Sequence, residues 1–142
     1  MTLSLDDAFS FVGQRSQGVL VTLRGDGRPQ LSNILYLPGP DHTARISVTD
    51  SRAKTTNLRR DPRGSLHVTS GDFWSYVVLD GTVDLSPVAA APDDAVVEEL
   101  VGMYRQAQGD HPDWDEFRRA MVSQGRIVAT LHATHAYGQV QD

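Results

Sequence analysis

The sequence predicts a mainly β, α+β fold: a six-stranded antiparallel barrel with three or four peripheral helices. Several segments alternate apolar and polar residues with the period of two that is typical of strands. They follow one another without the strand–helix alternation of a parallel sheet. The chain has 142 residues, 39% of them hydrophobic and 22% charged, which is ordinary for one globular domain. We therefore expect a single domain over residues 1–142.

The N-terminal part predicts a short helix followed by a hairpin. Apolar residues recur at helical spacing over Leu5–Val12, and Ser4 is a candidate N-cap. Residues 19–23 then alternate as a strand, and the turn Gly25–Gly27 contains an Asp-Gly step that tolerates positive φ. The extended run Gln30–Leu37 completes the predicted hairpin.

The middle of the chain predicts three more strands. Ala44–Thr49 and the region of Leu66–Val68 repeat the period-two pattern. A longer extended run, Trp74–Leu85, is interrupted by Asp80-Gly81, and this favours a bulge in one bent strand over a turn between two strands.

Two helices and a last strand are predicted in the C-terminal part. Pro92 suits the first position of a helix that ends at Gly109. A second helix opens near Pro112 and has Gly125 as its C-cap. The final strand begins at Ile127 and continues toward Tyr137.

Composition and motifs exclude several functional classes. The net charge of −5 argues against a general nucleic-acid binder. The absence of cysteine excludes disulfides and thiolate chemistry. His132 and His135 are three residues apart, which in a regular strand places them on opposite faces, so we expect no metal site.

Without a signal-like start or an apolar run long enough to span a membrane, we expect a cytoplasmic protein.

The most specific chemical signal is a cluster of cations after the Ala44–Thr49 strand. Six of the 13 basic residues fall between positions 45 and 63, and no acid occurs between Ser51 and Arg60. With Asp50 or Ser51 as N-cap, Arg52 and Lys54 would lie in the first turn of a helix, where cations are unfavourable unless an anion binds there. Together with the Thr55 hydroxyl and free backbone amides they would form a phosphate pocket.

The alternative is a solvated surface that pairs with acids elsewhere in the chain. Lys54 is the only lysine, which favours the functional interpretation. Arg59 and Arg60, at the end of the predicted helix, are better explained as surface pairs.

Two further groups of residues are candidates for a binding site. Gln30 and Ser32 lie on one face of their strand, and Leu31 and Asn33 on the other, so polar groups there could bond the edge of a heteroaromatic ring. An edge strand protected by polar residues is the competing explanation. Trp74 and Tyr76 share a face and would form either an aromatic wall, a dimer contact or part of the core.

Four segments resemble the coenzyme F420-dependent branch of the pyridoxamine 5′-phosphate oxidase-like split-barrel superfamily. They are Gly27–Asn33 (GRPQLSN), Arg52–Pro62 (RAKTTNLRRDP), Trp74–Tyr76 (WSY) and His135–Gly138 (HAYG). The resemblance covers nearly the whole chain, and its most specific part is the Arg-x-Lys-Thr-x-Asn-Leu element. It implies a split β-barrel of the FMN-binding type that forms a homodimer, with two clefts lined by both subunits.

The resemblance also implies which residues bind the cofactor. Arg52, Lys54, Thr55 and Asn57 would hold the phosphate and tail, whereas the segment Gln30, Leu31, Ser32 and Asn33 would line the deazaflavin ring. Thr49, Trp74 and Tyr76 would complete the cleft, the two aromatic residues from the partner subunit.

The function implied is that of an F420-dependent oxidoreductase that transfers hydride between the deazaflavin and a small electron-poor organic substrate. Two alternatives stay open: an FMN-binding oxidoreductase, or a protein that binds or stores F420 without turnover. No proton donor can be assigned, although Tyr76 is a candidate. Pyridoxamine phosphate oxidases end in an arginine-containing motif that this chain lacks in residues 137–142, so we do not expect vitamin B6 oxidation.

Overall fold

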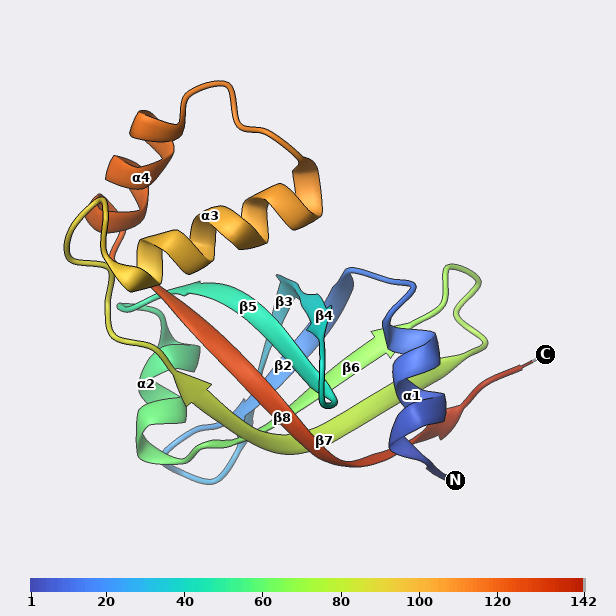
Figure 1. Cartoon of the computed structure of the whole chain (residues 1–142). Helices are drawn as coiled ribbons and strands as arrows, with labels where there is room; N and C mark the ends of the chain where they lie inside the picture. Colours follow the sequence, from blue (N-terminus) through green and yellow to red (C-terminus); the bar gives the residue numbers. More distant parts are fainter. Residues whose placement is uncertain (142) are drawn as a thin grey trace.

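The computed structural model describes residues 1–141, and within them the chain forms one antiparallel sheet of eight strands with four helices (Figure 1). The sheet order is β3-β2-β6-β7-β8-β5-β4, with β1 paired to β8. The strands are β1 (Thr2–Leu3), β2 (Gln17–Leu23), β3 (Pro29–Leu35), β4 (Leu37–Gly39), β5 (Thr43–Thr49), β6 (Arg63–Thr69), β7 (Tyr76–Leu85) and β8 (Arg126–Gln139). The helices are α1 (Leu5–Val12), α2 (Ala53–Arg60), α3 (Ala95–Gln108) and α4 (Trp114–Ser123).

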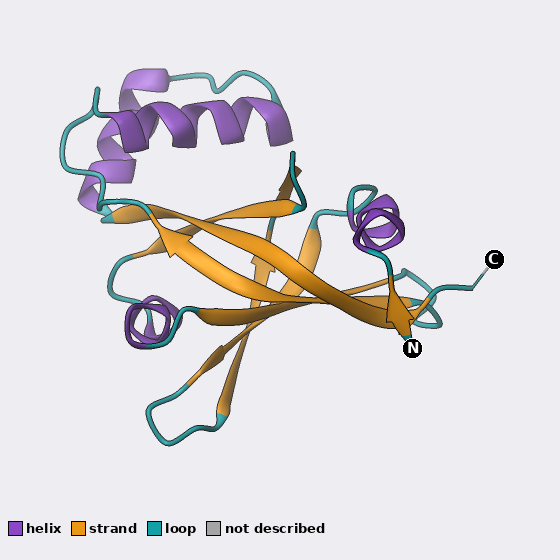
Figure 2. Ribbon diagram, turned by 60° about the horizontal axis from the view of Figure 1, so that its bottom comes forward, coloured by secondary structure: helices purple, strands orange, loops and turns teal. Residues whose placement is uncertain are grey.

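The fold class is confirmed, and the six long strands are the six predicted ones. The two additional strands, β1 and β4, have only two and three residues. Strands this short cannot show a periodic pattern, so the sequence does not reveal them. Figure 2 shows the strong curl of the sheet, which makes it a barrel open along one side.

The curl is set where the chain passes from one edge of the sheet to the other. The predicted strand Gln30–Leu37 is in fact broken at Tyr36, which separates β3 at one edge from β4 at the other. The Tyr36 amide donates to the Ser16 carbonyl, and its buried hydroxyl donates to the Val12 carbonyl at 2.6 Å. A single buried residue therefore joins the two edges, and this requires them to lie close together.

The long strand β7 is bent as predicted, but it starts at Tyr76, so Trp74 lies in the preceding turn. Pairing between β7 and β8 is irregular at Asp80/Gly81, and the unpaired extra residue is Thr134 of β8. A Cβ at position 81 would lie 2.0 Å from the His132 carbonyl oxygen. Glycine is therefore required here because the bulged strand passes too close for any side chain.

The helices begin and end close to the predicted positions, with two corrections. Ser4 caps α1, as predicted, by accepting a hydrogen bond from the Asp7 amide. The third helix starts later than Pro92, because the Asp94 carboxylate accepts from the Val97 amide and makes Asp94 the N-cap. The fourth ends with Gln124 as C-cap, and Gly125, at φ +63°, follows it.

Two separate hydrophobic clusters support these elements. The larger fills the barrel and includes α1 and residues such as Leu20, Leu66 and Leu79. The smaller lies between α3, α4 and the outer side of β8, with Val97, Leu100 and Val128 as members. In Figures 1 and 2, α3 and α4 lie together at one end of the sheet, apart from α1 and α2. None of the helices in the described part of the chain has the length and apolar character needed to cross a bilayer.

Removing the Tyr36 hydroxyl should destabilise the protein in a pH-dependent way. Tyr36→Phe removes the hydroxyl's bond to the Val12 carbonyl, which keeps only its bond from the Arg15 amide, and we expect a cost of about 0.5–1.5 kcal/mol. Burial raises the pKa of Tyr36, with a small opposing effect of Arg15, so this phenol stabilises the fold fully below its usual pKa of about 10 and progressively less above it.

Urea unfolding at neutral pH and near pH 11 should thus show a difference between wild type and Tyr36→Phe that shrinks at the higher pH. Tyr137→Phe, at a more exposed tyrosine, is the matched control and should unfold like wild type. A constant difference at both pH values would contradict the assigned titration.

Candidate functional site

The cationic segment lies where β5 leads into α2, but its cap differs from the prediction. Arg52 itself is the N-cap, with extended backbone angles and no side-chain capping bond. Asp50 is unavailable as a cap because its carboxylate pairs with Arg59. Arg52 therefore lies just before the first turn and Lys54 within it, so the beginning of α2 carries two cations and no capping acid.

A third cation, Arg126, joins these two from the start of β8. The pKa of Lys54 is lowered by burial and by the charges of Arg52 and Arg126. Among the described residues, none of the three forms an ion pair with a carboxylate; Arg126 only donates to the Gln124 side-chain oxygen at 2.9 Å. Three uncompensated positive charges at a helix N-terminus favour an anionic ligand.

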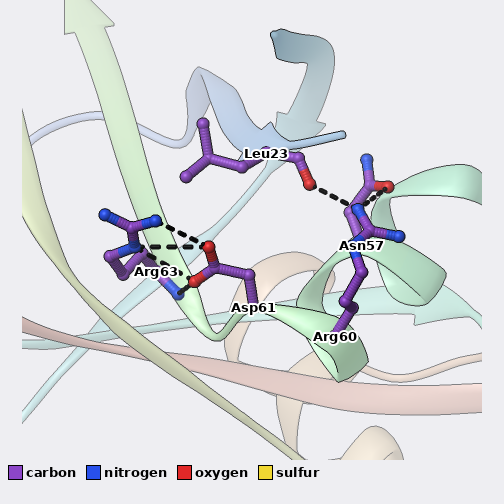
Figure 3. Close-up of polar contacts among 5 residues, drawn as sticks. All are labelled: Leu23, Asn57, Arg60, Asp61 and Arg63. Carbon is purple, nitrogen blue, oxygen red and sulfur yellow. Dashed lines mark hydrogen bonds and ion pairs between the residues drawn. The ribbon is translucent and has the colours of Figure 1, made fainter. Parts of the chain in front are cut away.

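The basic residues at the other end of α2 have partners within the fold. Arg60 donates to the Leu23 carbonyl at 2.8 Å and to the Asn57 side-chain oxygen at 3.0 Å, and Arg63 pairs with Asp61 at 2.8 Å (Figure 3). That pair also lowers the pKa of Asp61 to about 2. The cluster thus divides into structural cations around the end of α2 and free cations at its beginning.

Two of the expected phosphate ligands lie inside the protein. Thr55 is completely buried, and its hydroxyl donates to the Thr49 carbonyl at 2.8 Å. The Asn57 amide is also buried and donates to Thr22 Oγ1 at 3.1 Å and to Gln30 Oε1 at 2.7 Å. These bonds fasten α2 to β5, β2 and β3, so Thr55 and Asn57 position the cations, and Gln30 is engaged with Asn57.

Lys54 faces an open groove of about 810 Å³ that runs between the barrel and the α3–α4 hairpin. This volume is within the range of about 300–1,000 Å³ that is usual for small-molecule sites. Besides Lys54, Asn33 is the only residue of the predicted set in its wall. The groove also includes Arg45, Ser47 and Arg126, which contribute polar groups from β5 and β8.

The sequence did not single out Arg126 as a site residue, because its proximity to Lys54 depends on β5 pairing with β8. Thr49, the last residue of β5, is the register partner of Arg126. Only knowledge of this pairing could have identified Arg126.

Of the predicted residues on β3, only Asn33 lines the groove. On β3, Leu31 and Asn33 point outward and Gln30 and Ser32 are half-buried, as predicted for opposite faces. A second hollow, of about 560 Å³, shares Asn33 with the groove and contains His67.

The two predicted aromatic residues line neither hollow. Tyr76 stacks on His67, with a centroid distance of 5.6 Å, whereas Trp74 is 70% exposed in the turn before β7. Since Trp74 lies outside the strand, the prediction that it shares a strand face with Tyr76 is wrong.

The histidines form no metal centre in the described residues, where no group of three or more potential ligands occurs. His132 and His135 are nevertheless both exposed, contrary to the prediction of opposite faces. The extra residue Thr134 shifts the alternation between them.

Residues 5–138 match the sequence model of the family described as pyridoxamine 5′-phosphate oxidase. The chain belongs to this family. Solved structures share the fold at low sequence identity. A conserved hypothetical protein from Mycobacterium tuberculosis has a TM-score of 0.72 and 23% identity, over 96% of this chain and 84% of the other.

A protein named F420 reductase has a TM-score of 0.66 and 23% identity, over 91% of this chain and 94% of its own. The heme storage protein of Vibrio cholerae has a TM-score of 0.68 and 13% identity, over 95% and 94%. At such identities the likeness establishes the fold alone. Within the pyridoxamine 5′-phosphate oxidase family, the site of this chain must therefore be judged from its own residues.

Because Lys54 is the only lysine, its titration can be followed directly by NMR of protein labelled with ¹³C-lysine. We expect its pKa to lie below the usual value of about 10.4 and to rise in Arg126→Gln, which removes a nearby positive charge. A bound phosphate compound should raise it as well. Arg119→Gln, on the exposed surface of α4, should leave it unchanged. An identical Lys54 titration in wild type and Arg126→Gln would contradict the proposed cluster.

Proposed function

We propose that this protein is an F420-dependent reductase, in which hydride passes from the reduced deazaflavin to a small electron-poor organic acceptor. The observation that carries the proposal is the set of three unpaired cations, Arg52, Lys54 and Arg126, beside the groove. Such a set suits a cofactor that ends in a phosphate and an acidic tail.

The residues present fit this cofactor. The cations and the first amides of α2 would hold its phosphate, and Asn33 on the outward face of β3 would lie beside its ring. The deazaflavin would supply the hydride chemistry. The protein would bind and orient the cofactor and acceptor, and the α3–α4 hairpin would limit the access of water from one side.

The neighbours in fold space do not by themselves select a cofactor, since one is named for F420 and another for heme. The groove favours a phosphorylated flavin-like ligand, because in the described chain its wall contains the unpaired cations Lys54 and Arg126 but no histidine, a common heme ligand. FMN also has a phosphate that the same cations could bind, and it is the second candidate.

We also propose that the protein works as a homodimer. Leu31 and Leu35 are each 62% exposed on the outward face of the edge strand β3. Apolar side chains on an open sheet edge promote association. Light scattering of the purified protein should give twice the mass of the chain, and a monomer at all concentrations would contradict the dimer.

Cofactor choice can be tested by titrating the purified protein with F420, FMN and heme and then assaying oxidation of reduced F420 with a panel of enones and quinones. We expect tight binding of F420 and turnover with at least one acceptor. Tight binding of FMN or heme with no affinity for F420 would overturn the proposal. Tight F420 binding without oxidation by any acceptor would instead support a storage role.

Replacing Lys54 should weaken cofactor binding without unfolding the protein. We expect Lys54→Ala to cost about 1.5–3 kcal/mol of F420 binding, the scale of a hydrogen bond to a charged group. Fluorescence titration measures the effect directly. The matched control is Arg59→Ala in the same helix, where the lost cation is paired with Asp50. Equal affinities of Lys54→Ala and wild type would place the phosphate elsewhere.

A further inference from the structure

We propose that the α3–α4 hairpin is the acceptor-binding wall of the groove, that Tyr104 and Phe117 are specificity residues, and that the acceptor is a planar conjugated molecule without positive charge. That this molecule accepts the hydride rests on the proposed function. That the groove binds such a molecule does not depend on the proposed function, because it follows from the side chains of the groove alone.

The two sides of the groove differ in chemistry. Its cations come from the barrel and α2, whereas the wall that α3 and α4 supply is uncharged and, apart from Gln106 and Gln108, apolar. The large apolar residues of this wall are Leu100, Met103, Tyr104, Phe117 and Met121. A phosphorylated cofactor held at the cations would therefore leave the apolar wall to the other reactant.

Two of the five large apolar residues of this wall are aromatic, and their rings are held by one another. Tyr104 and Phe117 pack edge to face with a centroid distance of 5.2 Å, and Trp114, which does not line the groove, lies 5.6 Å from Phe117. Tyr104 and Phe117 are only partly buried. Rigid, partly exposed rings offer faces and edges on which a flat conjugated molecule can pack.

Arg45 holds the wall over the barrel. From β5 it reaches Glu99 and Gln106 of α3, at 3.3 Å to each side-chain oxygen. This contact links the two walls of the groove directly, so it helps to set the distance between them. The hairpin also has its own hydrophobic cluster, so it keeps its shape independently of the barrel core.

Charge limits what the groove accepts. Its described lining contains Lys54 and Arg126, which have no carboxylate partner, and Arg45, which pairs with Glu99, but no aspartate or glutamate of its own. Cationic ligands are therefore disfavoured, and neutral or anionic conjugated rings are favoured.

A fluorescent probe can test the wall without any cofactor. The chain has two tryptophans, so Trp74→Phe leaves Trp114 beside Phe117 as the only one. The anionic aromatic dye 1-anilinonaphthalene-8-sulfonate should bind saturably to this variant and quench Trp114 by energy transfer. In the same background, Phe117→Leu and Tyr104→Leu should each weaken dye binding about two- to tenfold, the scale of one aromatic contact.

Two further variants keep the test decisive. Ala107→Phe places a bulky ring in the groove at an exposed position of α3, so it should block the dye without removing any packing. Phe73→Gly removes a ring that is 80% exposed outside the groove, at φ +73° where glycine is favoured, and should leave dye binding unchanged. Thermal melts followed by circular dichroism identify any variant that fails to fold.

With reduced F420 and 1,4-naphthoquinone, the two leucine variants should raise KM in the same proportion while F420 affinity stays within about twofold of wild type. Unchanged dye affinity and unchanged KM in folded Phe117→Leu, Tyr104→Leu and Ala107→Phe would overturn the inference. Loss of dye binding in Phe73→Gly alone would do so too. Failure of wild type to bind F420 would reject the proposed function, while dye binding would still decide whether the wall holds a ligand.

Discussion

The passage of the chain through Tyr36 is the constraint on which the rest of the structure depends. One residue separates strands at opposite edges of the sheet, so the sheet must curl until those edges nearly meet. The buried ring and its bond to the Val12 carbonyl fix this crossing against α1. Residues 33–37 on both sides of the crossing line the groove, so the gap in the barrel and the candidate site have the same origin.

The cations beside this gap are brought together in two ways, by local sequence and by strand pairing. Arg52 and Lys54 are brought there by local sequence, at the turn from β5 into α2, whereas Arg126 is brought there by the pairing of β5 with β8. Burial, and to a smaller extent repulsion from Arg52 and Arg126, lowers the pKa of Lys54, and the buried bonds of Thr55 and Asn57 prevent α2 from moving away to relieve this strain. A cluster held against its own repulsion is most easily explained by an anion that binds there.

The same difference between local sequence and strand pairing also explains what could be predicted from the sequence. The six long strands, the bend near Gly81 and the cationic start of α2 depend on periodicity, glycine and local charge, and all are visible in the chain. The break at Tyr36, the contribution of Arg126 and the interior positions of Thr55 and Asn57 depend on contacts between distant segments. Side-chain type suggested a ligand role for Thr55, and the family resemblance implied one for Asn57, but the same hydrogen-bonding groups can equally join a helix to strands, as they do here.

Separate hydrophobic clusters allow the two halves of the groove to change independently. The barrel cluster holds the edges, α1 and the end of α2, whereas the second cluster holds α3 and α4 against the outer side of β8. A substitution at Phe117 would therefore alter the apolar wall while leaving the packing that positions Lys54 intact. This division is consistent with one fold carrying different ligands in different proteins, since function resides in the residues placed on the fold and not in the fold itself. For this chain, the residues proposed to select the ligands are the unpaired cations on one side of the groove and the aromatic rings on the other.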